Sequence, residues 1–176
     1  MNAWINSVQS SGFGTRAKSF SAIFVGSVIL SLVVVSLLPA QALTDSVEVK
    51  ALNTQASAAS LYTLNFTLAD TLYPDAGFEI SFPPGFDVSK VTIAGSKAIN
   101  GGFEVKVEGQ KVLVTRKGRG AVKLPGEKVD VMFSTVTNPA NPESNHKINV
   151  TIKKSQQATR TKELRGSVLI TAEKVQ

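Results

Sequence analysis

The chain has 176 residues, a formal net charge of +6, a single histidine and no cysteine. The lack of cysteine excludes disulfides, thiol catalysis and zinc–thiolate sites. Two of the 19 basic residues and none of the acidic ones precede residue 43, so the net charge of residues 43–176 is +4. This mild charge suits a soluble surface more than a dedicated nucleic-acid binder.

The N-terminal segment is typical of a secretory signal peptide. Arg16 and Lys18 precede an uncharged run over residues 20–38, and Ala40 and Ala42 then form a small-x-small cleavage site. We expect cleavage after Ala42 and export of the remainder. Because about 18 or more uncharged residues can also span a bilayer, a retained membrane anchor is the alternative.

Residues 43–176 have the length of one domain, and alternation of apolar and polar residues predicts about nine short strands in them. In chain order these strands cover residues 47–52, 61–69, 78–82, 90–95, 103–107, 111–116, 128–136, 147–154 and 166–172. Residues 108–110 predict a tight hairpin between the fifth and sixth strands. The side chains predicted to face the core are Tyr62, Leu64, Phe66, Leu68, Phe78, Ile80, Phe82, Val91, Ile93, Val129, Val131, Phe133, Ile148, Val150, Ile152, Val168, Ile170 and Ala172.

No stretch after residue 42 shows a helical period. The pattern therefore predicts an all-β fold, an Ig-like antiparallel β-sandwich of about 7–9 strands rather than a barrel, preceded by a signal-peptide helix. We expect three segments: the signal peptide at 1–42, an N-terminal strand and tether at 43–58, and the sandwich at 59–176.

Two stretches resemble immunoglobulin-like modules of secreted and cell-surface microbial proteins. Those modules carry an aromatic strand, an I-x-F-P-x-G-F stretch and a later Thr-Asn-Pro turn, and the similarity covers about residues 59–172. The matching residues are Ile80, Phe82, Pro83, Gly85, Phe86, Thr137, Asn138 and Pro139. The resemblance implies a spacer, adhesive or matrix role, although such modules often occur in long tandem chains and this chain carries one.

The residues give little support to catalysis. His146 is the single histidine, its neighbours are polar, and we expect it to be solvated at a loop-to-strand junction. Asp70, Asp75 and Asp87 could bind calcium if their loops shared one end of the sandwich, but their spacing matches no calcium loop, and turn capping explains them better. We therefore expect no enzyme, no catalytic or metal-binding residues and no cofactor.

Basic residues gather in two stretches that could contact an anionic ligand such as a polysaccharide. The alternative is that these residues keep an exported sheet soluble and blunt its edges. Nucleic acid is not expected, because interleaved aromatic residues for stacking are missing. The first stretch holds Arg116, Lys117, Arg119, Lys123 and Lys128, and the second holds Lys153, Lys154, Arg160, Lys162 and Arg165.

Two sequons, at Asn65 and Asn149, fall on outward positions of predicted strands and could accept glycans in a host that glycosylates exported proteins. The short Asn-x-Thr pattern also arises by chance.

The sequence as a whole predicts a secreted or cell-surface, non-catalytic protein with a structural, matrix or adhesive role. Alternatives are a filament subunit that assembles by exchange of its N-terminal strand, a binding module for anionic polysaccharide and, with least support, a secreted hydrolase. Expected partners are other cell-surface or matrix components, with further copies of the chain as an alternative. Membrane contact is expected only through an uncleaved signal segment.

Overall fold

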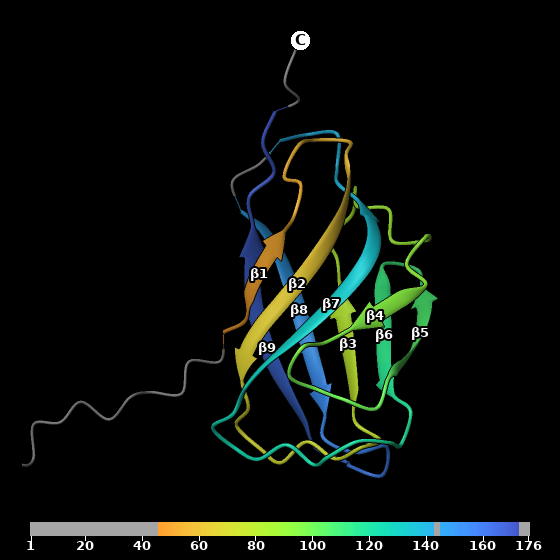
Figure 1. The fold of residues 1–176 in the computed structure, drawn as a ribbon. Helices are drawn as coiled ribbons and strands as arrows, with labels where there is room; N and C mark the ends of the chain where they lie inside the picture. Colours follow the sequence, from red (N-terminus) through yellow and green to blue (C-terminus); the bar gives the residue numbers. More distant parts are fainter. Residues whose placement is uncertain (1–45, 143–144, 173–176) are drawn as a thin grey trace, which may run out of the picture. The chain divides into compact units, whose positions relative to one another are not determined.

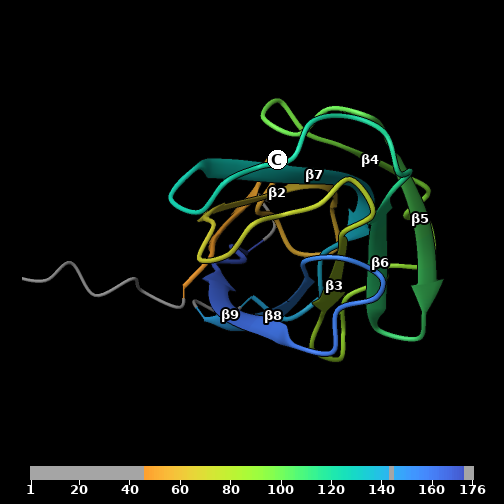
Figure 2. The same ribbon diagram turned by 90° about the horizontal axis from the view of Figure 1, so that it is seen from below.

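Two antiparallel β-sheets face each other in the computed structural model, which describes residues 46–142 and 145–172 (Figures 1 and 2). The four-stranded sheet has the order β1-β2-β7-β4, and the five-stranded sheet has the order β5-β6-β3-β8-β9. The strands are β1 (Glu48–Ala51), β2 (Ala59–Thr67), β3 (Gly77–Ser81), β4 (Ile93–Gly95), β5 (Phe103–Glu108), β6 (Lys111–Arg116), β7 (Lys128–Thr137), β8 (His146–Lys153) and β9 (Thr161–Val168). The predicted all-β sandwich is confirmed, whereas the predicted signal helix and Ala42 lie outside the described residues.

The core fills the space between the sheets, and alternation along the strands supplies it. In the central pair, β2 and β7, Tyr62 lies opposite Phe133 and Leu64 lies opposite Val131. Both aromatic rings are buried, and they stack with centroids 6.2 Å apart. Phe66, which is also predicted to be core, is 5% exposed. The buried apolar residues of the described chain run from Val47 to Ile170, so they all lie within the compact unit Leu43–Gln176.

Two predicted core residues are instead exposed. Ile93 is 69% exposed, because β4 pairs with β7 in a register that sets Ala94, not Ile93, beside buried Phe133. A turn in which Val91 N donates to Val88 O (3.0 Å) precedes β4, and it shifts the alternation by one residue.

Ala172 is exposed because it follows the end of β9, which starts and ends earlier than the predicted strand. The inward positions of β9 are Lys162, Leu164, Gly166 and Val168. Position 166 has room only for glycine, because the chain at Val47 and Val49 lies directly over it. A Cβ there would collide with the carbonyl oxygen of Val47. Because two of these inward residues are lysine and glycine, the strand shows no apolar–polar alternation, and the sequence did not predict its first half.

The first strand closes one side of the sandwich. It pairs antiparallel with β2, and Val47 N just before it donates to Arg165 O of β9 (3.2 Å). After β1 the chain stays against the C-terminal segment through the parallel bridge Gln55↔Thr171. The sequence left open whether residues 47–52 pair with their own sheet or with the sheet of another copy. In the structure they pair with β2 of the same chain.

The two stretches that carry the family resemblance meet at one end of the sandwich. Asp87 N donates to Thr137 O (3.0 Å), and Thr137 N donates to Asp87 O (2.8 Å). The hydroxyl of Tyr62 donates to Asn138 Oδ1 (2.6 Å), and Asn138 Nδ2 donates to the carbonyl oxygens of Asn53 and Gln55. Burial raises the pKa of Tyr62, which therefore remains a neutral donor. The Thr-Asn-Pro turn thus fastens the segment after β1 to the aromatic core.

Residues 46–142 and 145–172 contain no helix that is long and apolar enough to cross a bilayer. The uncharged run over residues 20–38 lies outside the part that the structure describes.

Candidate functional site: a basic loop end

Four loops meet at the end of the sandwich that lies opposite the Thr-Asn-Pro turn, at the bottom of Figure 1 and nearest the viewer in Figure 2. They are the β2–β3 loop (68–76), the β4–β5 loop (96–102), the β6–β7 loop (117–127) and the β8–β9 loop (154–160). We call this region the basic end.

Main-chain hydrogen bonds join the loops of the basic end to one another. Leu72 and Lys123 exchange two of them, with N–O distances of 2.9 and 3.0 Å. Tyr73 N donates to Lys154 O (2.9 Å), and Gly118 N donates to Pro74 O (3.0 Å). The β2–β3 loop is therefore held between the two loops that carry most of the basic residues.

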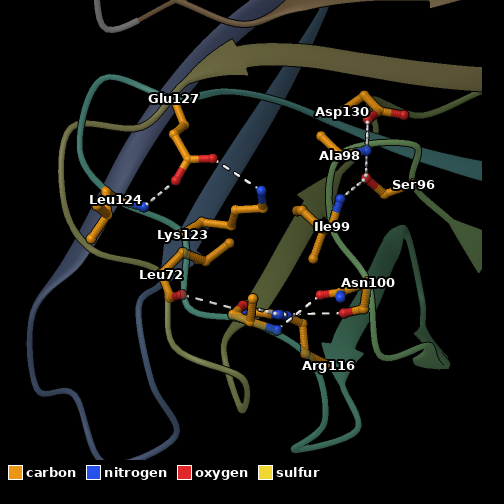
Figure 3. A network of polar contacts seen from close by, with 11 residues as sticks. Leu72, Ser96, Ala98, Ile99, Asn100, Arg116, Lys123, Leu124, Glu127 and Asp130 are labelled. Carbon is orange, nitrogen blue, oxygen red and sulfur yellow. Dashed lines mark hydrogen bonds and ion pairs between the residues drawn. The ribbon is translucent and has the colours of Figure 1, made fainter.

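Arg116 lies on the core side of these loops, and its side chain donates hydrogen bonds to three of them (Figure 3). Its side chain is 2% exposed. Nη1 donates to Tyr73 O (2.6 Å) and Leu72 O (3.3 Å), and Nη2 donates to Ala121 O (2.8 Å) and Asn100 O (3.3 Å). Burial lowers the pKa of Arg116 and the charge of Asp75 opposes the change, but a guanidinium remains charged at neutral pH. The sequence placed Arg116 among surface contacts for an anion; the structure corrects this, because the side chain is buried and its Nη1 and Nη2 atoms donate to main-chain carbonyls.

Glycines allow the β4–β5 and β6–β7 loops to approach closely above Arg116. Gly101 and Gly120 both have positive φ, at 99° and 95°. A Cβ at Gly101 would collide with the carbonyl of Arg119, and one at Gly120 would collide with the carbonyl of Asn100. Asn100 Oδ1 also accepts a hydrogen bond from Ala121 N (2.9 Å). This contact requires glycine on both sides.

Carboxylates at this end act as turn caps. Asp75 accepts hydrogen bonds from Ser155 Oγ (2.8 Å) and Gln156 N (3.1 Å). Burial opposes ionisation of Asp75, but these hydrogen bonds outweigh it and hold its pKa below the usual value. Glu127 accepts from Leu124 N and pairs with Lys123 Nζ (3.0 Å), and these contacts lower its pKa in the same way.

Asp130, on β7, fixes the start of the β4–β5 loop (Figure 3). Its carboxylate accepts hydrogen bonds from Lys97 N, Ala98 N (2.9 Å) and Ser96 Oγ (3.0 Å). Burial raises the pKa of Asp130, but the three donors outweigh it, so the net shift is downward.

The structure brings both basic stretches to this end. From the first stretch, Lys117, Arg119 and Lys128 are exposed and Lys123 is half-buried. From the second, Lys153, Lys154, Arg160 and Lys162 flank or belong to the β8–β9 loop. Arg165 is separate, because it lies in β9 beside Ser46 and Val47. Two clusters that are more than 20 residues apart in the sequence thus lie at the same end of the sandwich, on either side of the β2–β3 loop.

Exposed apolar side chains lie in the same loops, and the sequence did not single them out. Tyr73, Val122 and Leu124 are 45%, 42% and 59% exposed. Val122 and Leu124 alternate with Lys123 as residues of a strand do, which conceals them, and Tyr73 directly precedes a turn proline.

His146 is buried rather than solvated, which corrects the expectation from the sequence. It is 9% exposed at the start of β8, and its ring meets Phe86 edge to face at a centroid distance of 5.2 Å. The alternation that buries Ile148 and Val150 continues back to position 146, so the histidine belongs to the aromatic core.

The three loop aspartates do not share one end. Asp75 precedes β3 and Asp87 follows it, so the length of the strand separates them. Asp87 accepts hydrogen bonds from Ser89 N (2.9 Å) and Ser89 Oγ, as expected for a turn cap. Among the described residues, no three His, Cys, Asp or Glu side chains lie close enough to hold a metal ion.

Both sequon asparagines face outward. Asn149 is exposed on β8, and Asn65 on β2 is half-buried and donates to Glu48 Oε2 (3.1 Å). Glycosylation at either asparagine remains a prediction.

Comparison with known proteins finds similarity in structure only. No protein-family model matches the chain, and no curated protein sequence matches it. Among solved structures, the chain is similar to the major pilin SpaD of Corynebacterium diphtheriae (TM-score 0.47, 18% identity) and to the N-terminal domain of the Streptococcus gordonii adhesin Sgo0707 (TM-score 0.46, 12% identity). The aligned regions cover 68% and 72% of this chain, but only 33% and 32% of those chains.

A third similar structure, the bacterial hydrophobin BslA, has a TM-score of 0.46 and 16% identity, with coverage of 74% of this chain and 95% of BslA. The fold is the Ig-like β-sandwich of microbial surface proteins that the sequence resemblance indicated. At these identities and scores the similarities concern the fold, and no site or ligand is carried over from them.

Proposed function

We propose that the protein is a secreted or cell-surface β-sandwich with a non-catalytic structural, matrix or adhesive role. The observation that carries this proposal is the use of its buried polar side chains. Arg116 binds main-chain carbonyls, Tyr62 and Asn138 fasten a turn, and His146 packs on an aromatic ring. These groups stabilise a scaffold and do not converge on an open cavity.

Deletion of the gene in the native organism tests this role through attachment to surfaces and cohesion of the extracellular matrix. We expect deletion to weaken one of these, and we expect wild-type protein and His146→Asn to restore it equally. An unaffected deletion strain would contradict the proposal. So would a correctly folded His146→Asn variant that fails to restore the phenotype, because it would favour the hydrolase alternative.

The convergence of both basic stretches supports the second candidate, a binding module for an anionic polysaccharide. Retention on an anionic polysaccharide column that salt reverses tests this candidate. The filament alternative requires β1 to leave its own β2 and pair with a neighbouring copy. A chain that starts at Ala59 should then be a destabilised monomer that a peptide of residues 43–52 rescues, and a strictly monomeric mature protein without fibres would contradict the idea.

A further inference from the structure

Apolar and basic side chains alternate across the basic end. The antiparallel bridge Leu72↔Lys123 sets Tyr73 beside Val122, and the main-chain bond from Tyr73 N to Lys154 O places Lys154 on the other side. Leu124 follows Lys123 and is the most exposed of the three apolar residues. The outermost surface of these loops is therefore both apolar and cationic.

The net charge of this surface is positive because its basic residues outnumber its acidic ones, which are exposed Asp70 and the engaged Asp75 and Glu127. Asp75 accepts from Ser155 and Gln156, and Glu127 pairs with Lys123. The exposed cations around the apolar residues are Lys117, Arg119, Lys153 and Arg160, with half-buried Lys154 among them. Below them the buried guanidinium of Arg116 adds a further positive charge.

We propose that the basic end docks onto the surface of an anionic lipid bilayer. Lysine and arginine side chains meet the charged headgroups, each strengthening binding about fivefold near such a surface. Tyr73, Val122 and Leu124 enter the boundary between headgroups and acyl chains, where tyrosine is favoured and aliphatic groups leave water. A soluble polyanion would engage the cations but would leave the three apolar side chains in water.

The loops are built to present these residues without rearrangement. Arg116, the paired main-chain bonds of Leu72 and Lys123 and the close approach of Gly101 and Gly120 fix their positions before any contact. Little ordering entropy is then lost on docking. This inference goes beyond the structural or adhesive role proposed above and does not depend on it.

Co-sedimentation of the Leu43–Gln176 unit with lipid vesicles tests the proposal. This unit contains the whole described core, and a cooperative thermal unfolding transition confirms its folding first. We expect binding to vesicles of phosphatidylcholine mixed with phosphatidylglycerol, weak or no binding to phosphatidylcholine alone, and weaker binding as salt is raised.

Two sets of variants separate the two parts of the surface. Lys117→Gln with Arg119→Gln and Lys154→Gln should weaken binding about a hundredfold, at about fivefold for each residue. Val122→Ser with Leu124→Ser should weaken vesicle binding about tenfold through lost apolar burial, but should leave retention on dextran sulfate unchanged. Matched controls elsewhere on the sandwich are Lys90→Gln with Lys106→Gln and Lys147→Gln, and Leu52→Ser with Leu169→Ser, all at exposed positions.

Three results would overturn the proposal. The first is a wild-type unit that does not sediment with the anionic vesicles at low salt. The second is a folded Val122→Ser/Leu124→Ser variant that binds vesicles as tightly as wild type, which would favour a site for soluble polyanions. The third is an equal loss of binding in the matched controls, which would indicate attraction by net charge alone.

Discussion

Replacing Arg116 by methionine should destabilise the fold, although Arg116 is the last residue of β6 and lies next to surface loops, where substitutions usually cost little. Of its four hydrogen bonds, those to Tyr73 O (2.6 Å) and Ala121 O (2.8 Å) are short. Bonds from a charged donor contribute about 1.5–3 kcal/mol each, so the two together are worth about 3–6 kcal/mol. Methionine also removes the cost of burying a charge, and water can reach some of the released carbonyls at a loop end. We therefore expect a net loss of about 2–4 kcal/mol.

Urea unfolding of the Leu43–Gln176 unit measures this loss. With a slope of about 2 kcal/mol per molar urea, the midpoint should fall by about 1–2 M. Arg119→Met is the matched control, because Arg119 is exposed in the same loop region and its replacement should change stability by less than about 0.5 kcal/mol. An Arg116→Met protein within about 0.5 kcal/mol of wild type would refute the assignment of Arg116 as the tie between the loops.

Three further predictions concern the core, the acid range and the N-terminus. Phe133→Ala should cost about 3–5 kcal/mol in the same unfolding assay, and a loss below about 1 kcal/mol would mean that the register of β7 is inverted. Because the pKa of Asp130 is lowered in the folded state, its contribution to stability should be present above the unfolded pKa of about 3.9 and lost as pH falls through the folded value. Asp130→Asn should flatten the acid limb of a stability–pH curve, and an unchanged limb would count against this reading. Intact mass of native protein should start at Leu43; a product that retains residues 20–38 would indicate an anchor instead.

Alternation along the strands predicted most of the sandwich. It correctly buried Tyr62, Phe66 and Phe133, because the inner face of each strand has no other function than packing. The same rule, followed one step further, would have buried Arg116, which shares a face with Val112 and Val114, and His146, which shares one with Ile148. Residue type led the sequence interpretation to place both outside, although their position in the strand indicated the core.

The basic end could not be predicted from the sequence in the same way. Its assembly depends on the order β5-β6-β3-β8-β9, which places the β6–β7 and β8–β9 loops at one end with the β2–β3 loop between them. Strand order is a consequence of long-range pairing, and local patterns carry little information about it. The exposed positions of Tyr73, Val122 and Leu124 follow from loop geometry for the same reason.

The location of the native protein tests the central claim of an exported, surface-associated scaffold most directly. Intact cells would be treated with a membrane-impermeant lysine reagent and then fractionated. Mass spectrometry would give the intact mass and the extent of labelling of the protein recovered from each fraction. The account predicts a labelled chain of residues 43–176 in the cell-surface or extracellular fraction. An unlabelled chain that begins at Met1 and stays in the cytoplasm would contradict it.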